Sequence, residues 1–423
     1  MSQSHASHDR ESKTACPRCG RTDTWGYFPT RYCLIHRCVA CRYYMDNPLP
    51  TFQKAIVYLD QFVISNMVKA KDPYWAVLAE RLDKLMGNQL LACPYSPIHR
   101  RESMLFFDLS DALQEMYKRL GGSDRFRKPE EIQEAQLVRG IRQYLAPGSE
   151  QQGSDGWKGA LDENPHLYTG DMVVNVIMTH HPFITESVRQ EKERLFNGLQ
   201  GVCDYRRQHP ATFQEDLDSE FVGFADVSME LYRKAAGSAA YDRRRPPFLS
   251  APVLLVHRLA AEVQEIRPQE PDPITVVDTF LHSSDVRTTP CLDISCRLWA
   301  TIAQKERSPK GPRSPKASDS YDVDMISHYA PFCDAMFVDN EFRGMATEGQ
   351  VGVTQRYGVK LFSEKKDGRD EFLEYLDTIS ASATDNHWDK VAACDPRFGA
   401  LLAKARELKK QVQGGMKGQE NGQ

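Results

Sequence analysis

Several features are missing from this sequence of 423 residues, and each absence excludes a class of protein. No apolar run approaches the roughly 20 residues that a membrane-spanning helix needs. Residues 1–13 are polar and charged and contain no apolar segment of the kind found in secretory signal peptides. With 54 basic and 58 acidic residues the net charge is −4, which excludes a uniformly basic nucleic-acid-binding protein. Any contact with nucleic acid must depend on local patches of charge.

Common nucleotide-binding and hydrolase motifs are also missing. The sequence contains neither a GxxxxGK[ST] nor a GxGxxG loop, and neither a GxSxG nor an HExxH segment. Its 11 cysteines are an odd number in a chain without a signal peptide, which argues against a disulfide framework. We therefore expect a cytoplasmic protein in a reducing compartment, without membrane contact.

The clearest chemical signal is two Cys-x2-Cys pairs separated by 18 residues. This spacing is typical of a structural zinc site with four thiolate ligands. Cys33 and His36 lie between the pairs and form a rival half-site, but we expect them to serve as packing residues. The predicted zinc ligands are Cys16, Cys19, Cys38 and Cys41.

The segment around these cysteines is basic and rich in aromatic residues such as Trp25, Tyr43 and Tyr44. Basic groups interleaved with rings suit single-stranded nucleic acid. The rings could equally form the small core of a zinc ribbon, with the charges in solvent. Both interpretations stay open at this point.

Four short apolar runs, each flanked by polar or turn residues, predict buried parallel strands. They are Ala55–Leu59, Leu90–Cys93, Ala335–Val338 and Val359–Phe362. The long interval between the second and third runs has helical periodicity, for example over 184–202 and 253–266. We expect an α/β fold: a parallel sheet flanked by helices, with a large, mostly helical insertion at about 105–300.

The sequence thus divides into four zones. Residues 1–13 are predicted to be a disordered leader, and 14–50 a zinc ribbon that ends in a proline-rich linker. Residues 51–412 hold the α/β domain with its insertion. The glycine- and glutamine-rich residues 413–423 are predicted to be a disordered tail.

Acidic residues stand where the predicted strands end. Asp60 follows the first strand, Glu102 begins a helix after the second, and Asp339 follows the third. Asp322 and Asp324 lie on a helix just before the third strand. Ligands of parallel α/β sheets bind beyond the carboxyl ends of the strands. Clustered carboxylates there would bind Mg²⁺ or Mn²⁺, which favour oxygen ligands.

Three segments, VYLDQFVISN, CPYSPIHRRES and YDVDMISHYAPFCDAMFVDNEF, together resemble a PIN-like nuclease domain. The resemblance covers residues 54–105 and 318–365, and leaves out the cysteine module and the helical insertion. It implies a metal-dependent endonuclease that hydrolyses phosphodiester bonds, with RNA favoured over DNA. Many bacterial members are toxins or defence effectors, and an inhibitory or activating protein partner is compatible with such a role.

The resemblance places acidic site residues at Asp60, Glu102, Asp322 and Asp339. Asp324 competes with Asp322, because residues two apart on a helix point in different directions. Glu341 competes with Asp339, and Asp334 is either an outer ligand or a turn former. The alternative function is a catalytically inactive PIN-like module that binds nucleic acid or protein.

Overall fold

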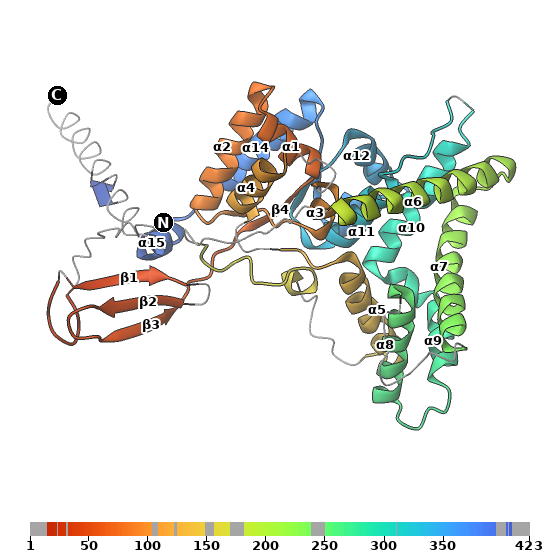
Figure 1. Ribbon diagram of the computed structural model, residues 1–423, viewed down its shortest axis with the longest axis horizontal. Helices are drawn as coiled ribbons and strands as arrows, with labels where there is room; N and C mark the ends of the chain where they lie inside the picture. Colours follow the sequence, from red (N-terminus) through yellow and green to blue (C-terminus); the bar gives the residue numbers. More distant parts are fainter. Residues whose placement is uncertain are drawn as a thin grey trace, which may run out of the picture.

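The computed structural model describes residues 15–22, 24–30, 33–103, 109–121, 125–148, 156–169, 182–237, 250–309, 311–394, 403–404 and 406–407. The predicted leader at 1–13 and tail at 413–423 lie outside these ranges. A small three-stranded sheet lies to one side of a larger body built on a second sheet (Figure 1). The small sheet consists of β1 (Trp25–Pro29), β2 (Cys33–Cys38) and β3 (Tyr44–Pro48).

The larger sheet is parallel and confirms all four predicted strands to within one residue at each end. Its order is β5-β4-β6-β7, so β4 and β6 are the central neighbours. The register pairs Leu59 at the end of β4 with Phe337 at the end of β6. The strands are β4 (Ala55–Leu59), β5 (Leu91–Ala92), β6 (Ala335–Phe337) and β7 (Lys360–Phe362).

Alternate side chains of these strands enter two separate cores, as the two-residue period of a strand requires. Val57 and Phe337 face one core, and Tyr58 and Met336 face the other. One face is covered by α1 (Gln61–Lys69), α2 (Pro73–Gly87), α4 (Ser110–Gly121) and α14 (Lys366–Ala381). The other is covered by α10 (Pro290–Glu306), α11 (Asp319–Tyr329) and α12 (Asn340–Thr347).

Most of the predicted insertion is a helical unit with its own apolar core. The predicted apolar face at 253–266 is buried there, with Val256 and Leu259 fully enclosed. Helix α10 joins this core to the sheet, because Leu292 enters the helical core and Leu298 the sheet core. The unit contains α5 (Pro129–Leu145), α7 (Phe213–Ala236), α8 (Ala251–Ile266) and α9 (Pro273–Leu281).

Helix α6 (Pro182–Gln208) contains the predicted helical segment over 184–202. The apolar side that its periodicity indicates is only partly covered. Val188 is buried, but Leu195 and Val202 are 38% and 44% exposed. The helix runs along the edge of the body (Figure 1), so only part of this face is covered.

The remaining described helices are short. They are α3 (Pro97–Ser103), α13 (Val353–Tyr357), α15 (Asp385–Cys394) and the 3-10 turns η2 (Gly156–Gly159), η3 (Asp285–Thr288) and η4 (Ala330–Phe332). Within the described ranges, no helix is both long and apolar enough to cross a membrane.

Candidate metal centre and acidic sheet edge

The four predicted zinc ligands come together at one end of the small sheet. The sulfur atoms of Cys16 and Cys41 are 3.7 Å apart, and those of Cys19 and Cys38 are 3.6 Å apart. All four lie within 4.8 Å of one another. Tetrahedral zinc with bonds of about 2.3 Å places its sulfur ligands about 3.8 Å apart. The cluster therefore has the dimensions of a zinc site.

Local backbone turns hold each cysteine pair in place. In the first turn, the Cys16 N–H donates to the Arg21 carbonyl, and the Gly20 N–H donates to the Cys16 carbonyl. Gly20 has a φ of 71°, a left-handed conformation that glycine adopts without steric cost. In the second turn, the Cys38 N–H donates to the Tyr43 carbonyl. Local backbone hydrogen bonds thus position the two cysteines of each Cys-x2-Cys pair.

The rival half-site does not join this cluster. The Cys33 sulfur lies 3.3 Å from the Thr30 hydroxyl, and His36 stacks on Trp25 with ring centroids 5.6 Å apart. Trp25 also stacks on Tyr43 and is 6% exposed, so these rings form the small core of the ribbon. Tyr44, by contrast, is 61% exposed.

At the larger sheet, Asp60 lies at the carboxyl edge between the two central strands. It directly follows β4 and precedes α1, and its backbone N–H donates to the Phe337 carbonyl of β6 at 3.0 Å. Its side chain is 8% exposed. Burial raises the pKa of Asp60 well above its usual range, and the nearby Glu102 and Asp339 carboxylates add to this increase.

Three further segments bring acids to the same edge. Glu102 lies near the end of α3, not at its beginning as predicted, because the helix already starts at Pro97. Asp322 is in the first turn of α11, and Asp339 follows β6 as the N-cap of α12. Desolvation raises the pKa of all three. Asp60, Asp339 and Glu102 raise the pKa of Asp322 further. Four acids from four segments therefore share one electrostatic environment.

These acids are less tightly grouped than the cysteines. Among the residues that the structure describes, the cysteine cluster is the one group of three or more metal-binding side chains with ligand atoms within 4.8 Å. The carboxylates converge on one edge but do not form such a close set. Mg²⁺ commonly uses one or two carboxylates and keeps several waters. The donor chemistry therefore fits Mg²⁺ or Mn²⁺, with at most a few protein ligands per ion.

The structure also separates the two pairs of competing acids. Asp324 is exposed by surface area, although desolvation by its neighbours raises its pKa to about 7, with smaller contributions from Glu130 and Arg101. Asp322 instead interacts with the acids of the edge. Glu341 forms ion pairs with Arg313 and Lys316, which lower its pKa although burial acts in the opposite direction. Asp322 and Asp339 are thus the members that face Asp60.

Asp334 has a structural role at the opposite end of the sheet. Its Oδ2 accepts a hydrogen bond from the Ile56 N–H at 2.7 Å and so joins the beginnings of β4 and β6. It also lines a cavity of about 880 Å³ together with Lys54, Trp157 and His166. That cavity lies at the amino ends of the strands, away from Asp60.

The structure adds one residue that sequence reasoning missed. Lys192 of α6 lies with its Nζ 5.0 Å from the centre of the Tyr321 ring, and it lowers the pKa of Glu102 against the effect of desolvation. Nothing in the local sequence of α6 indicates this position, because α6 precedes α11 by more than 100 residues.

Residues 305–316, directly before α11, are rich in lysine and arginine, and the described basic side chains among them form ion pairs. Lys305 pairs with Glu348, and Arg307 pairs with Asp216. Arg313 forms a bidentate pair with Asp319, with both N–O distances 2.6 Å. This pair fixes the first turn of α11 and thereby helps to position Asp322.

Comparisons of the chain with protein-family models, with curated proteins and with solved structures gave no match. The function must therefore be inferred from the chain's own residues.

Proposed function

We propose that this protein is a metal-dependent nuclease that hydrolyses phosphodiester bonds, with RNA as the favoured substrate. The observation that carries the proposal is the convergence of Asp60, Glu102, Asp322 and Asp339 at the carboxyl edge of a parallel sheet. Burying several carboxylates together is unfavourable unless they are protonated or neutralised by a cation. A cation-binding role gives this costly arrangement a reason.

Asp60 and Asp322 are the best-placed residues to hold a divalent cation, because each interacts with the other acids of the edge. A bound Mg²⁺ or Mn²⁺ would polarise the phosphate and lower the pKa of a coordinated water. Asp339 is held by the Phe342 N–H, which donates to its Oδ1 at 2.8 Å and orients the carboxylate. Glu102 adds negative charge from α3.

We further propose that zinc is the metal of the cysteine cluster and that its role is structural. Four thiolates occupy every position of a tetrahedral ion and leave none open for substrate. The described core of the ribbon, centred on Trp25, Cys16 and Cys38, is small. Metal binding would therefore supply much of the folding free energy of this module.

The second candidate is a non-catalytic module that binds nucleic acid, and one observation favours it. Lys192 already supplies positive charge to Glu102. A lysine in that position could neutralise the acids in place of a metal ion.

A cleavage assay separates the two functions. Zinc-loaded protein is incubated with labelled single-stranded and structured RNA and DNA, with Mn²⁺, Mg²⁺ or no added divalent cation. The Asp60→Asn/Asp322→Asn variant is the test protein, and Asp324→Asn is its matched control on the same helix. A nuclease cleaves only with Mn²⁺ or Mg²⁺, loses this activity in the double variant and keeps it in the control. Metal-independent cleavage, equal cleavage by the double variant, or no cleavage of any substrate would overturn the proposal.

A further inference from the structure

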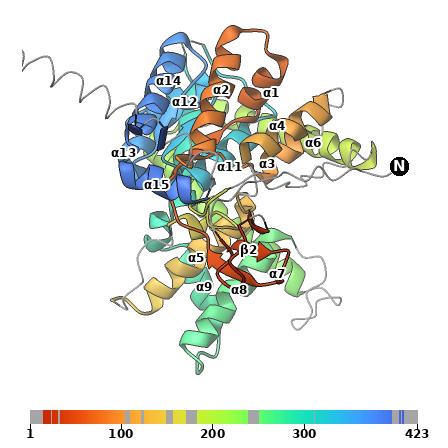
Figure 2. The same cartoon turned by 90° about the vertical axis from the view of Figure 1, so that its left-hand side faces the viewer.

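Helix α6 (Pro182–Gln208) brings basic side chains to the acidic edge. Figures 1 and 2 both place the beginning of α6 beside α3, the helix that carries Glu102. Lys192 reaches the ring of Tyr321, the residue directly before Asp322. Its positive charge therefore lies next to two segments of the acidic edge.

Lys192 belongs to a stripe of three residues, which we call the α6 stripe: Arg189, Lys192 and Phe196. Residues three and four apart lie on the same side of a helix, so these side chains are neighbours. Together with Glu193 and Ala317 they line a cavity of about 380 Å³. Phe196 is 37% exposed, which leaves part of its ring open.

Arg189 is accessible for binding. Its described ion pair, with Glu186, lies on the surface, with side chains 60% and 51% exposed. Such exposed ion pairs contribute little to stability, so this pair does not commit Arg189 to Glu186. The α6 stripe thus offers two cations and one ring within about two helical turns.

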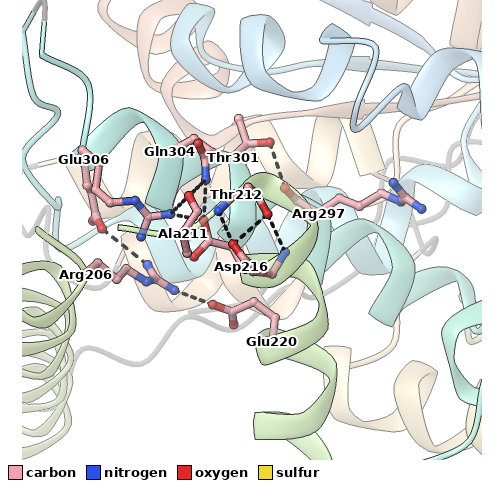
Figure 3. Close-up of polar contacts among 11 residues, drawn as sticks. Arg206, Ala211, Thr212, Asp216, Glu220, Arg297, Thr301, Gln304 and Glu306 are labelled. Atoms are coloured by element: carbon pink, nitrogen blue, oxygen red, sulfur yellow. Dashed lines mark hydrogen bonds and ion pairs between the residues drawn. The ribbon is translucent and has the colours of Figure 1, made fainter. Parts of the chain in front are cut away.

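The far end of α6 is fixed by a network of charged residues, shown in Figure 3. Arg206 pairs with Glu220 of α7 and, at 3.4 Å, with Glu306 of α10. The Arg206 and Glu306 side chains are 13% and 3% exposed, so this anchor is largely shielded from water. Lys192 lies 14 residues, or about 21 Å, back along the helix. The anchor sets the direction of the helix and so holds the stripe beside the acids.

We propose that the α6 stripe is a binding subsite for single-stranded RNA, in which Lys192 and Arg189 bind phosphates and Phe196 stacks on a base. Alternating cations and rings are the usual means of binding a single strand without reading its sequence. The subsite rests on the proposed nuclease function in one respect: a strand bound there leads to the acidic edge. The binding itself does not require cleavage.

The test measures binding without turnover. A fluorescently labelled single-stranded RNA of mixed sequence is titrated with zinc-loaded Asp60→Asn/Asp322→Asn protein, and fluorescence anisotropy gives Kd. Adding Lys192→Gln should raise Kd about fivefold and make its salt dependence shallower by about one unit of slope, as expected for a lost phosphate contact. Lys192→Arg should restore most of the affinity. Glu193→Gln should tighten binding slightly, because it removes an anion from the cavity wall.

Two further variants separate the subsite from general charge effects. Phe196→Ala should weaken binding of single-stranded RNA and leave binding of a blunt RNA duplex unchanged, because paired bases cannot stack on the ring. Lys234→Ala, on the exposed surface of α7, is the control and should leave Kd unchanged. Unchanged Kd in Lys192→Gln, or equal losses in Lys192→Gln and Lys234→Ala, would overturn the subsite.

These outcomes are independent of the cleavage assay. If the stripe binds RNA but no metal-dependent cleavage occurs, the nuclease proposal fails and the subsite stands. If cleavage occurs and Lys192→Gln leaves both Kd and KM unchanged, the subsite fails and the nuclease proposal stands.

Discussion

The cysteine cluster and the acidic edge are both candidate metal sites, but they are built in different ways. The cysteine sulfur atoms already lie 3.6–3.7 Å apart in pairs, whereas the carboxylates converge without forming a comparably close set. Short backbone turns hold the sulfur atoms close together before metal binds, but buried carboxylates repel each other unless they are protonated. The first site is held by local turns, and the second by the packing of four separate segments.

The largest expected effect follows from removing zinc from the cysteine cluster. Structural zinc contributes on the order of 10 kcal/mol to folding of small modules, so a zinc chelator should unfold the ribbon and leave the larger body folded. Hydrogen exchange is the measurement: amides of β2 should lose protection, while those of β4 should keep it. Cys33→Ser is the matched control and should retain zinc and protection. A ribbon that stays protected after metal removal would contradict the structural role.

The free energy of unfolding should depend far more on the buried Arg313–Asp319 ion pair beside the acidic edge than on the exposed Lys316–Glu341 pair. Arg313 and Asp319 have side chains 8% and 0% exposed, so Arg313→Ala leaves a buried carboxylate without its partner. We expect a loss of about 3–5 kcal/mol in the free energy of unfolding, measured by urea denaturation. Lys316→Ala removes an ion pair whose lysine is 55% exposed and should cost less than about 1 kcal/mol. Equal losses in both variants would show that Arg313 does not position α11.

Mn²⁺ should stabilise the protein more at pH 8 than at pH 5.5. Burial raises the pKa of Asp60 and Asp322, so the folded protein favours their protonated forms when no metal is bound. The stability that the folded protein gains from these protonated acids is fully present at low pH. It is lost as the pH rises through the raised pKa values of Asp60 and Asp322. Mn²⁺ at about 100 times its Kd would add about 2.7 kcal/mol, but protons compete with it at pH 5.5.

The corresponding measurement is Tm of zinc-loaded protein with and without Mn²⁺ at both pH values. The Asp60→Asn/Asp322→Asn variant should show no Mn²⁺-dependent shift. An Mn²⁺-dependent rise in Tm of that variant, or a larger rise at pH 5.5 than at pH 8, would mean that the cation binds away from Asp60 and Asp322.

The smallest effect is expected at Asp324. It is exposed and interacts with Glu130 and Arg101, so Asp324→Asn should change kcat/KM for cleavage less than about twofold. Asp322→Asn, two residues earlier on the same helix, should abolish cleavage. Similar losses in both variants would mean that the structure separates these two acids incorrectly.

The sequence by itself determined the elements whose causes are local. A strand such as Ala55–Leu59 is apolar over its whole length because both faces of the sheet are covered. The spacing of the cysteines determined which four form the cluster, since the two turns that hold them span only a few residues each. The sequence also determined the position of Asp60, because the apolar run Ala55–Leu59 shows where the strand ends and Asp60 is the next residue.

Only the tertiary structure decided which acids face one another. Asp322 and Asp324 have the same chemistry in sequence. They differ because Asp322 interacts with Asp60, Asp339 and Glu102, whereas Asp324 interacts with Glu130 and Arg101. The exposed apolar residues of α6 and the placement of Lys192 depend on contacts with helices more than 100 residues away. Periodicity reveals that a helix has an apolar side, but whether that side is covered depends on how distant segments pack.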